Sequence, residues 1–342
     1  MSGHISPTAR QEAGAAAAPA GVALTLLRSL VHRIAVFGFL LVLMSVLPRL
    51  LPGDTLDVLM DSDVQRELAD DDLHALRDRL GFGGSLAEQV GRDLLRLLRG
   101  DLGYSLLHGA PVRRLLAEAL PWTGLLIAAA TPVFLGLGIM LGVEAGRQPG
   151  SRADRVLTAG MSLLASIPPF VTAIALLLVF AILCPVLPAG GAEPLFPAAT
   201  PWLRAFEIAR HAVLPALALA LHEVVRYFFV LRGEAAVLSH RAFVVNARSR
   251  GISGWRERRD YFSRNLLPVI CARLGQSVAT LFTASLFVEV IFAYPGIGSL
   301  TYQAVLDRDY ALLQGAIAVL AALVLSLNWL FDALTETLAR RG

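Results

Sequence analysis

The sequence predicts an all-α, polytopic membrane protein with six transmembrane helices and a small helical subdomain outside the membrane. Three observations predict this fold class. Of the 342 residues, 56% are hydrophobic and only 17% are charged. The apolar residues gather in long runs, and the arginines gather in some of the short segments between these runs. A chain of this composition cannot bury all its apolar surface in one water-soluble core, so membrane lipid is its expected solvent.

The first expected span covers residues 28–48, and it follows an alanine-rich segment, residues 1–27, that we interpret as a mobile cytoplasmic tail. The apolar part of this span follows Arg28 and Arg33, as it would in a signal peptide. However, Pro48 stands where a signal peptide would carry a small-residue cleavage site. We therefore expect the segment to be retained as a transmembrane helix.

Residues 49–118 separate the first span from the second and are predicted to form a helical subdomain on the outer face. Two stretches within this segment, residues 70–84 and 85–105, carry helix signals. Each begins with acidic or capping residues, repeats leucine or valine at helical spacing, and contains glycine at its end.

Five further spans form the expected permeation domain, residues 119–335, which is followed by a short cytoplasmic tail, residues 336–342. Each apolar run is long enough to cross about 30 Å of hydrocarbon at about 1.5 Å per residue. Pro168 and Pro169 interrupt one run, and neighbouring helices can satisfy the backbone that such a break frees. The five runs cover residues 122–143, 156–187, 211–231, 266–292 and 311–334.

The distribution of arginine predicts that the N-terminus lies in the cytoplasm of a bacterial cell, with the chain in the inner membrane. Short loops rich in arginine stay on the cytoplasmic side. The segment from Arg232 to Arg264 contains eight arginines and three acidic residues, whereas residues 294–310 contain one arginine and two aspartates. The former segment is therefore expected inside and the latter outside.

The composition also bears on cofactors. All 30 basic residues are arginine, and a P-loop requires a lysine to reach the nucleotide phosphates, which excludes a standard P-loop here. Any ATP and Mg²⁺ that drive this protein are expected to be bound by partner chains. Cys184 and Cys271 have no metal-type spacing, so no metal site is expected, and a net charge of +3 is too small to indicate nucleic acid binding.

The densest positive charge lies in NARSRGISGWRERRDYFSRN, residues 246–265, which contain six arginines. This stretch resembles the cytoplasmic loop of permease subunits of binding-protein-dependent ABC importers. Within that family it is most similar to the B-type subunit of the dipeptide, oligopeptide and nickel branch. The residues that carry the likeness are Ala247, Arg248, Arg250, Gly251, Ile252, Arg264, Asn265, Leu267 and Pro268.

The resemblance extends over residues 29–335, because other family blocks follow in the right order. They include RGDLGYS (99–105), SIPPF (166–170), LPAGG (187–191) and VEVIFAYPGIGSLTYQAVLDRDY (288–310). The loop departs from the family pattern at Tyr261, where histidine is usual, and at Val237 and Ala242, which replace acidic residues. These departures affect individual contacts rather than the assignment.

The resemblance implies a subunit with no catalytic residues of its own that forms half of a translocation pathway for peptides or nickel-type solutes. Its implied partners are a homologous second permease, two ATPase subunits and an extracytoplasmic solute-binding protein. Residues 233–265 would form the coupling loop, with Gly251 permitting a tight turn. We expect a short helix after this turn, at roughly residues 253–262, to dock on an ATPase subunit. The candidate docking residues are Ala247, Arg248, Arg250, Gly251, Ile252, Trp255, Arg258, Arg259, Arg264 and Asn265.

Two acidic residues in or near the ends of spans, Glu289 and Asp332, are candidates for the translocation pathway, because ionisable groups inside a membrane are costly and usually functional. For Glu289 a structural contact with the neighbouring YPGIG segment is an equal alternative. The alternative function for the whole chain is a gradient-driven secondary transporter, which would require acidic residues within the membrane. Only Glu223 and Glu289 meet that requirement even loosely.

Overall fold

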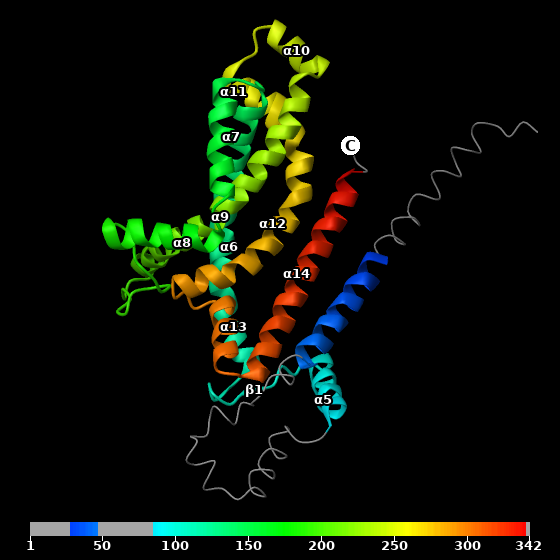
Figure 1. Ribbon diagram of the computed structural model, residues 1–342, viewed down its shortest axis with the longest axis vertical. Helices are drawn as coiled ribbons and strands as arrows, with labels where there is room; N and C mark the ends of the chain where they lie inside the picture. Colours follow the sequence, from blue (N-terminus) through cyan, green and yellow to red (C-terminus); the bar gives the residue numbers. More distant parts are fainter. Residues whose placement is uncertain (1–27, 47–84, 340–342) are drawn as a thin grey trace, which may run out of the picture.

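The computed structural model describes residues 28–46 and 85–339, with the backbone alone at residues 86, 332 and 334–339. Most of these residues are helical (Figure 1). The elements in chain order are the N-terminal helix Arg28–Val46, α5 Leu86–Leu98, β1 Tyr104–Ser105, β2 Ala110–Pro111, α6 Val112–Gly146, α7 Arg152–Ala165, α8 Pro169–Leu177, the π-helix η2 Leu178–Leu183, α9 Pro201–Ser239, α10 Ala242–Ser249, α11 Gly254–Arg256, the π-helix η3 Glu257–Ser263, α12 Arg264–Ile291, α13 Ile297–Leu306 and α14 Tyr310–Ala339.

The predicted all-α, polytopic fold is confirmed. Among the described residues, five helices are long and apolar enough to span a membrane, and a bent pair of helices gives a sixth if it is counted as one span. That pair is the predicted run 156–187, which is not one straight helix. Its two parts, α7 and α8 with η2, meet at an angle of 96°. Pro168 and Pro169 explain the bend, because proline lacks an N–H donor and disfavours helical backbone in the residue before it.

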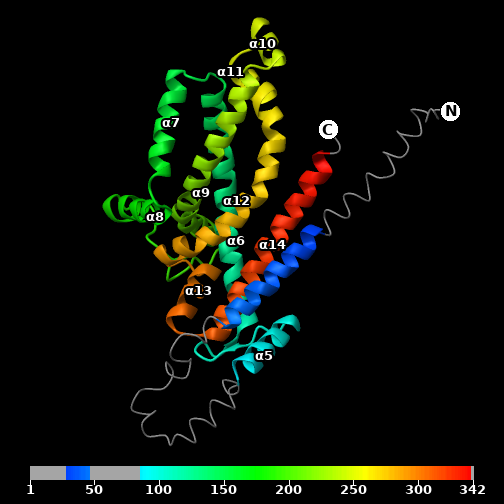
Figure 2. The ribbon, with the colours of Figure 1, turned by 45° about the vertical axis from the view of Figure 1, so that its right-hand side comes forward.

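The ends of the helices form two opposite sides of the molecule. Helices α10 and α11 lie at one end, together with the connection between α6 and α7, whereas α5, β1 and α13 lie at the other end (Figures 1 and 2). The two arginine-rich connections that follow α6 and α9 are therefore on the same side. This grouping is what the predicted topology requires.

Part of the predicted outer subdomain lies within the described residues. Ser85 and Glu88 cap the start of α5 reciprocally, as the sequence signal predicts. After α5 in the chain, strands β1 and β2 pair antiparallel in a short hairpin. Helix α6 begins at Val112, so the predicted boundary between residues 118 and 119 falls within a continuous helix. The other predicted helix, residues 70–84, lies outside the described residues.

Helices α6 and α9 pack closely through a stripe of small residues. Gly138, Gly142 and Gly146 follow one another at four-residue intervals on α6. A Cβ atom added at Gly142 would lie 2.9 Å from the Cβ of Leu231, and one at Gly146 would lie 2.4 Å from the backbone oxygen of Arg232. Small residues at this spacing allow helix backbones to approach in membranes, where packing rather than the hydrophobic effect drives association.

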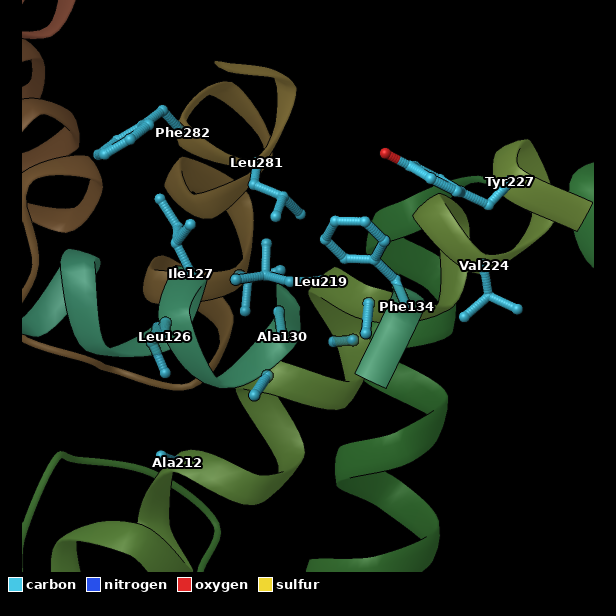
Figure 3. Packing of buried hydrophobic residues seen from close by; sticks show 14 of the residues in the cluster. Leu126, Ile127, Ala130, Phe134, Ala212, Leu219, Val224, Tyr227, Leu281 and Phe282 are labelled. Carbon is cyan, nitrogen blue, oxygen red and sulfur yellow. The ribbon is translucent and has the colours of Figure 1, made fainter. Parts of the chain in front are cut away.

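The same two helices build the main apolar cluster, and α12 completes it. Figure 3 shows Leu126, Ile127, Ala130 and Phe134 of α6 facing residues of α9 and α12. The rings of Phe134 and Tyr227 pack at 5.1 Å between centroids. The cluster therefore fixes α6, α9 and α12 relative to one another, and these are the helices that reach the arginine-rich end.

Candidate coupling surface

The connection between α9 and α12 contains a separate short helix, α10, which ends at the predicted glycine. The N–H of Gly251 donates to the carbonyl of Arg248 at 2.9 Å, and the N–H of Ile252 donates to the carbonyl of Ala247 at 3.1 Å. This pair of bonds is a Schellman motif, which satisfies carbonyl groups at a helix C-terminus. Gly251 has φ of +80°, a value that glycine adopts without steric cost. The predicted tight turn is thus confirmed.

The prediction of a separate helix after the glycine, at residues 253–262, is wrong. The separate helix is α10, which precedes Gly251, and the chain from Gly254 to Ile291 runs as one helix of 38 residues. The physical reason is local. Neither glycine nor proline occurs between Gly254 and Pro268, so nothing ends the helix where the polar segment meets the apolar run.

Five charged residues bind α10 to the end of α6 and to η3, which continues into α12. We call them the coupling network: Glu144, Arg147, Arg248, Glu257 and Arg258. Glu144 accepts hydrogen bonds from Arg147 at 3.0 Å and from Arg258 at 2.6 Å. Glu257 accepts from Arg248 at 2.7 Å and from Arg147 at 3.4 Å. Arg248 also donates to the backbone oxygen of Arg147 at 2.8 Å.

The coupling network changes the interpretation of two predicted docking residues. Arg248 and Arg258 bind carboxylates of their own chain rather than presenting free guanidinium groups to a partner. The carboxylate at the centre, Glu257, is only 3% exposed. Because α10 is held to both α6 and α12, a force on α10 reaches two spans at once.

A second ion pair joins the neighbouring helices at the same end. Arg232 of α9 donates to both carboxylate oxygens of Asp154, at 2.5 and 3.0 Å, in a fork-like arrangement. Asp154 also accepts from the N–H of Gly150 at 2.8 Å and lies in the first turn of α7. The connection between α6 and α7 is thereby fixed to α9.

The remaining predicted docking residues differ in exposure. Ala247 is buried and Ile252 is half-buried, so both serve the turn itself. Arg259 pairs with the adjacent Asp260 at 2.7 Å, and Asn265 donates to the carbonyl of Tyr261 at 2.7 Å. The exposed members of the predicted set are Arg250, Gly251, Trp255, Arg259, Arg264 and Asn265.

Sequence reasoning missed the apolar face of α10. Phe243 and Val245 are 42% and 53% exposed, and Trp255 beyond the turn is 70% exposed. Val244 and Ala247 point inward. The signal was present in the apolar stretch FVVNA before the glycine, but the dense arginines after the glycine favoured a docking helix there. Apolar side chains next to arginines are typical of the core of a protein interface.

Glu289 lies in a closed structural contact at the other end of α12. Its carboxylate accepts from the hydroxyl of Thr123 at 2.7 Å and from the N–H of Ser299 at 3.1 Å. The same Thr123 hydroxyl accepts from the N–H of Ile297 at 2.9 Å. Glu289 is completely buried, which favours the structural alternative over a place in the pathway. Asp332 lies on α14, and its side chain is outside the described part of the chain.

Comparisons with known proteins bear on what this arrangement does. Residues 135–341 match the family described as the inner membrane component of binding-protein-dependent transport systems. A protein of Brucella abortus named as a peptide transport system permease is 30% identical over 309 residues, which cover 90% of this chain and 95% of the relative. The oligopeptide transport system permease protein AppB of Bacillus subtilis is 28% identical over 295 residues, covering 86% and 90% of the two chains. The chain therefore belongs to the family of inner membrane components of binding-protein-dependent transport systems.

Proposed function

We propose that this chain is the B-type permease subunit of an ATP-driven importer of peptides. Membership of the family makes it a transport subunit rather than an enzyme, with ATPase and solute-binding proteins as partners in general. The peptide substrate is supported by the names of the relatives, which refer to peptides. Family membership also argues against the gradient-driven alternative.

The proposed complex contains this chain, a homologous second permease, two ATPase subunits that bind ATP and Mg²⁺, and an extracytoplasmic solute-binding protein. The N-terminus and the coupling surface are assigned to the cytoplasm. Support for this orientation comes from the arginine-rich connections, which lie together at one end of the molecule, as the positive-inside rule predicts.

The single observation that carries the coupling role is the construction of α10. It combines an exposed apolar face with a fixed turn at Gly251 and a network that anchors it to α6 and α12. A docking helix with these properties transmits the closure of an ATPase dimer as a rigid-body motion of the spans. The face around Phe243, Val245 and Trp255, with Arg250 and Arg256 beside it, is assigned to the ATPase groove.

The test compares Gly251→Arg with Gly233→Ala in the complete transporter, reconstituted in proteoliposomes. Gly251 requires a positive φ that arginine adopts only with strain, whereas Gly233 lies within α9 with open space around its Cα. We expect Gly251→Arg to insert and assemble but to lose peptide uptake and the stimulation of ATP hydrolysis by loaded binding protein. Gly233→Ala should transport normally. Normal uptake by Gly251→Arg would refute the coupling role.

A second measurement addresses the energy source and the docking partner. Uptake should require ATP and persist when ionophores abolish ion gradients. A cysteine introduced at Val245 should cross-link to an ATPase subunit, and one introduced at Leu195, which is 95% exposed near the start of α9, should not. Uptake that follows an ion gradient without ATP would favour the gradient-driven transporter instead.

A further inference from the structure

A polar pocket lies between α9 and α12, away from the coupling surface. Its lining is formed by Glu223, Arg226, Tyr227, Val230, Arg273, Gln276 and Ser277. The free volume is about 60 Å³ for water-sized groups. One water needs about 10–15 Å³ by this measure, so the pocket has room for a few waters or one small polar group. A whole peptide would not enter it.

The two arginines of this pocket lie within the predicted spans, toward the end of the molecule that carries the coupling surface. At about 1.5 Å per residue, Arg226 is roughly 8 Å from the end of the apolar run 211–231, and Arg273 is roughly 10 Å from the start of the apolar run 266–292. Both side chains are exposed on the surface of this chain. Both line the polar pocket, which provides a polar environment for their charges within the spans, where lipid contact is costly.

The pocket carries more hydrogen-bond donors than the protein uses. Arg226 donates through Nη1 to Oε1 of Glu223 at 2.7 Å. The other donors of Arg226, and all five of Arg273, find no acceptor among the described residues. Two guanidinium groups face one carboxylate, so the pocket has excess positive charge. The planar fork of arginine is suited to binding a carboxylate through two parallel hydrogen bonds.

A second, independent observation concerns the buried carboxylate. Glu223 is 4% exposed in its side chain, and its Oε2 atom accepts no hydrogen bond from the described part of the protein. A buried acceptor without a partner is costly unless a ligand or water donates to it. The wall of the pocket therefore presents an acceptor beside the excess donors. The C-terminus of a peptide has the complementary arrangement, because its carboxylate accepts hydrogen bonds and the N–H of the last peptide bond beside it donates one.

We propose that this pocket binds the C-terminal carboxylate of a peptide as the peptide crosses the membrane. Arg273 and Arg226 donate hydrogen bonds to the carboxylate, and Glu223 positions Arg226 through the hydrogen bond between them. This inference rests on the proposed function, since the pocket forms one wall of a pathway whose other wall comes from the second permease.

The experiment uses the complete transporter in proteoliposomes, with ATP supplied to the ATPase subunits and binding protein in excess. Uptake of one tripeptide is compared with uptake of the same tripeptide carrying a C-terminal amide. The binding protein can prefer one form, but it contributes the same factor to every permease variant. The ratio of the two rates, variant against wild type, therefore reports on the permease. Arg273→Gln is the main variant, and Arg210→Gln, on α9 outside the pocket, is the control.

We expect Arg273→Gln to lower uptake of the free-acid peptide about tenfold, as for loss of a charge-assisted hydrogen bond, and to change uptake of the amide less than twofold. Arg273→Lys keeps the positive charge but loses the two parallel donors of the guanidinium, so it should give an intermediate ratio. This variant also tests the proposal if Arg273→Gln fails to assemble. Arg210→Gln should leave the ratio unchanged.

Four outcomes would overturn the proposal. An equal loss for both peptides would assign Arg273 to gating or packing. An unchanged ratio with poor assembly would assign the pocket to a carboxylate of the partner permease. If the wild-type transporter imports neither peptide, the proposed function itself fails, and the peptide ligand with it. If the wild type imports the peptides and the ratio is unaltered in the variants, the carboxylate-binding role of the pocket is refuted while the proposed function stands.

Discussion

Replacing Glu257 by glutamine should loosen α10 from the spans without unfolding the protein. Glu257 is 3% exposed and accepts hydrogen bonds from Arg248 at 2.7 Å and from Arg147 at 3.4 Å. Glutamine keeps the shape and one oxygen acceptor but removes the charge. It also places an NH₂ group beside guanidinium donors, where it has no acceptor.

The expected loss follows from these contacts. Converting one charge-assisted hydrogen bond to a neutral one costs about 1 kcal/mol, and the longer contact to Arg147 adds a few tenths. A buried NH₂ without an acceptor costs about 1 kcal/mol more. Arg248 is 35% exposed, so water replaces part of the lost interaction. We therefore expect about 1.5 kcal/mol, or roughly a tenfold increase in local opening of α10.

The assay is amide hydrogen exchange of α10 in the assembled transporter, together with the number of peptides imported per ATP hydrolysed. Exchange in α10 should accelerate about tenfold, and the transport yield per ATP should fall. The matched control is Asp260→Asn, three residues along the chain, whose partner Arg259 is an exposed neighbour. Equal exchange rates in α10 for Glu257→Gln and Asp260→Asn would refute the anchoring role of Glu257.

Two further predictions concern helix packing and a buried hydrogen-bond network. Gly146→Ala should destabilise the α6–α9 pair by about 1–3 kcal/mol, because its Cβ would lie 2.4 Å from a backbone oxygen. The assay is the thermal midpoint in detergent, which the control Gly136→Ala should not lower because there is open space around its Cβ. Equal midpoints would show that α6 and α9 can move apart freely. Thr123→Val should cost about 2–5 kcal/mol, since it removes a donor from buried Glu289 and an acceptor from the N–H of Ile297. Thr131→Val, which loses only a bond to its own helix at Ile127, should stay within about 0.5 kcal/mol of wild type in the same thermal assay.

The spans and the turn could be predicted from sequence because each depends on local chemistry. Apolar runs of sufficient length require a helix in lipid, and the glycine at position 251 marks a helix end. The sequence predicts an interruption at Pro168 and Pro169 but not the change of direction that the structure shows there. The direction of a chain after a break depends on the helices against which it packs, and no local pattern records that packing.

The candidate site was less predictable because the pairing of its charges depends on how the turn and the helices are arranged. Arg248 and Arg258 look alike in sequence to Arg250 and Arg259, yet only the first two reach Glu257 and Glu144. Glu257 lies nine residues from Arg248, across the turn at Gly251, whereas 114 residues separate Arg258 from Glu144, on elements that meet only after folding. A dense run of arginines could therefore indicate an important loop without showing which side chains face outward.

The length of α9 has a mechanical consequence. Its 39 residues span roughly 58 Å, about twice the thickness of the hydrocarbon layer. The glycine stripe holds α9 against α6 between Val224 and Ala235, so this part of the helix moves as a rod rather than bending. A tilt of about 5° around its cytoplasmic end would displace Arg226, roughly 20 Å away, by almost 2 Å. Such a displacement exceeds the tolerance of a bidentate hydrogen bond, so small rotations at the membrane surface are sufficient to switch a carboxylate from bound to released.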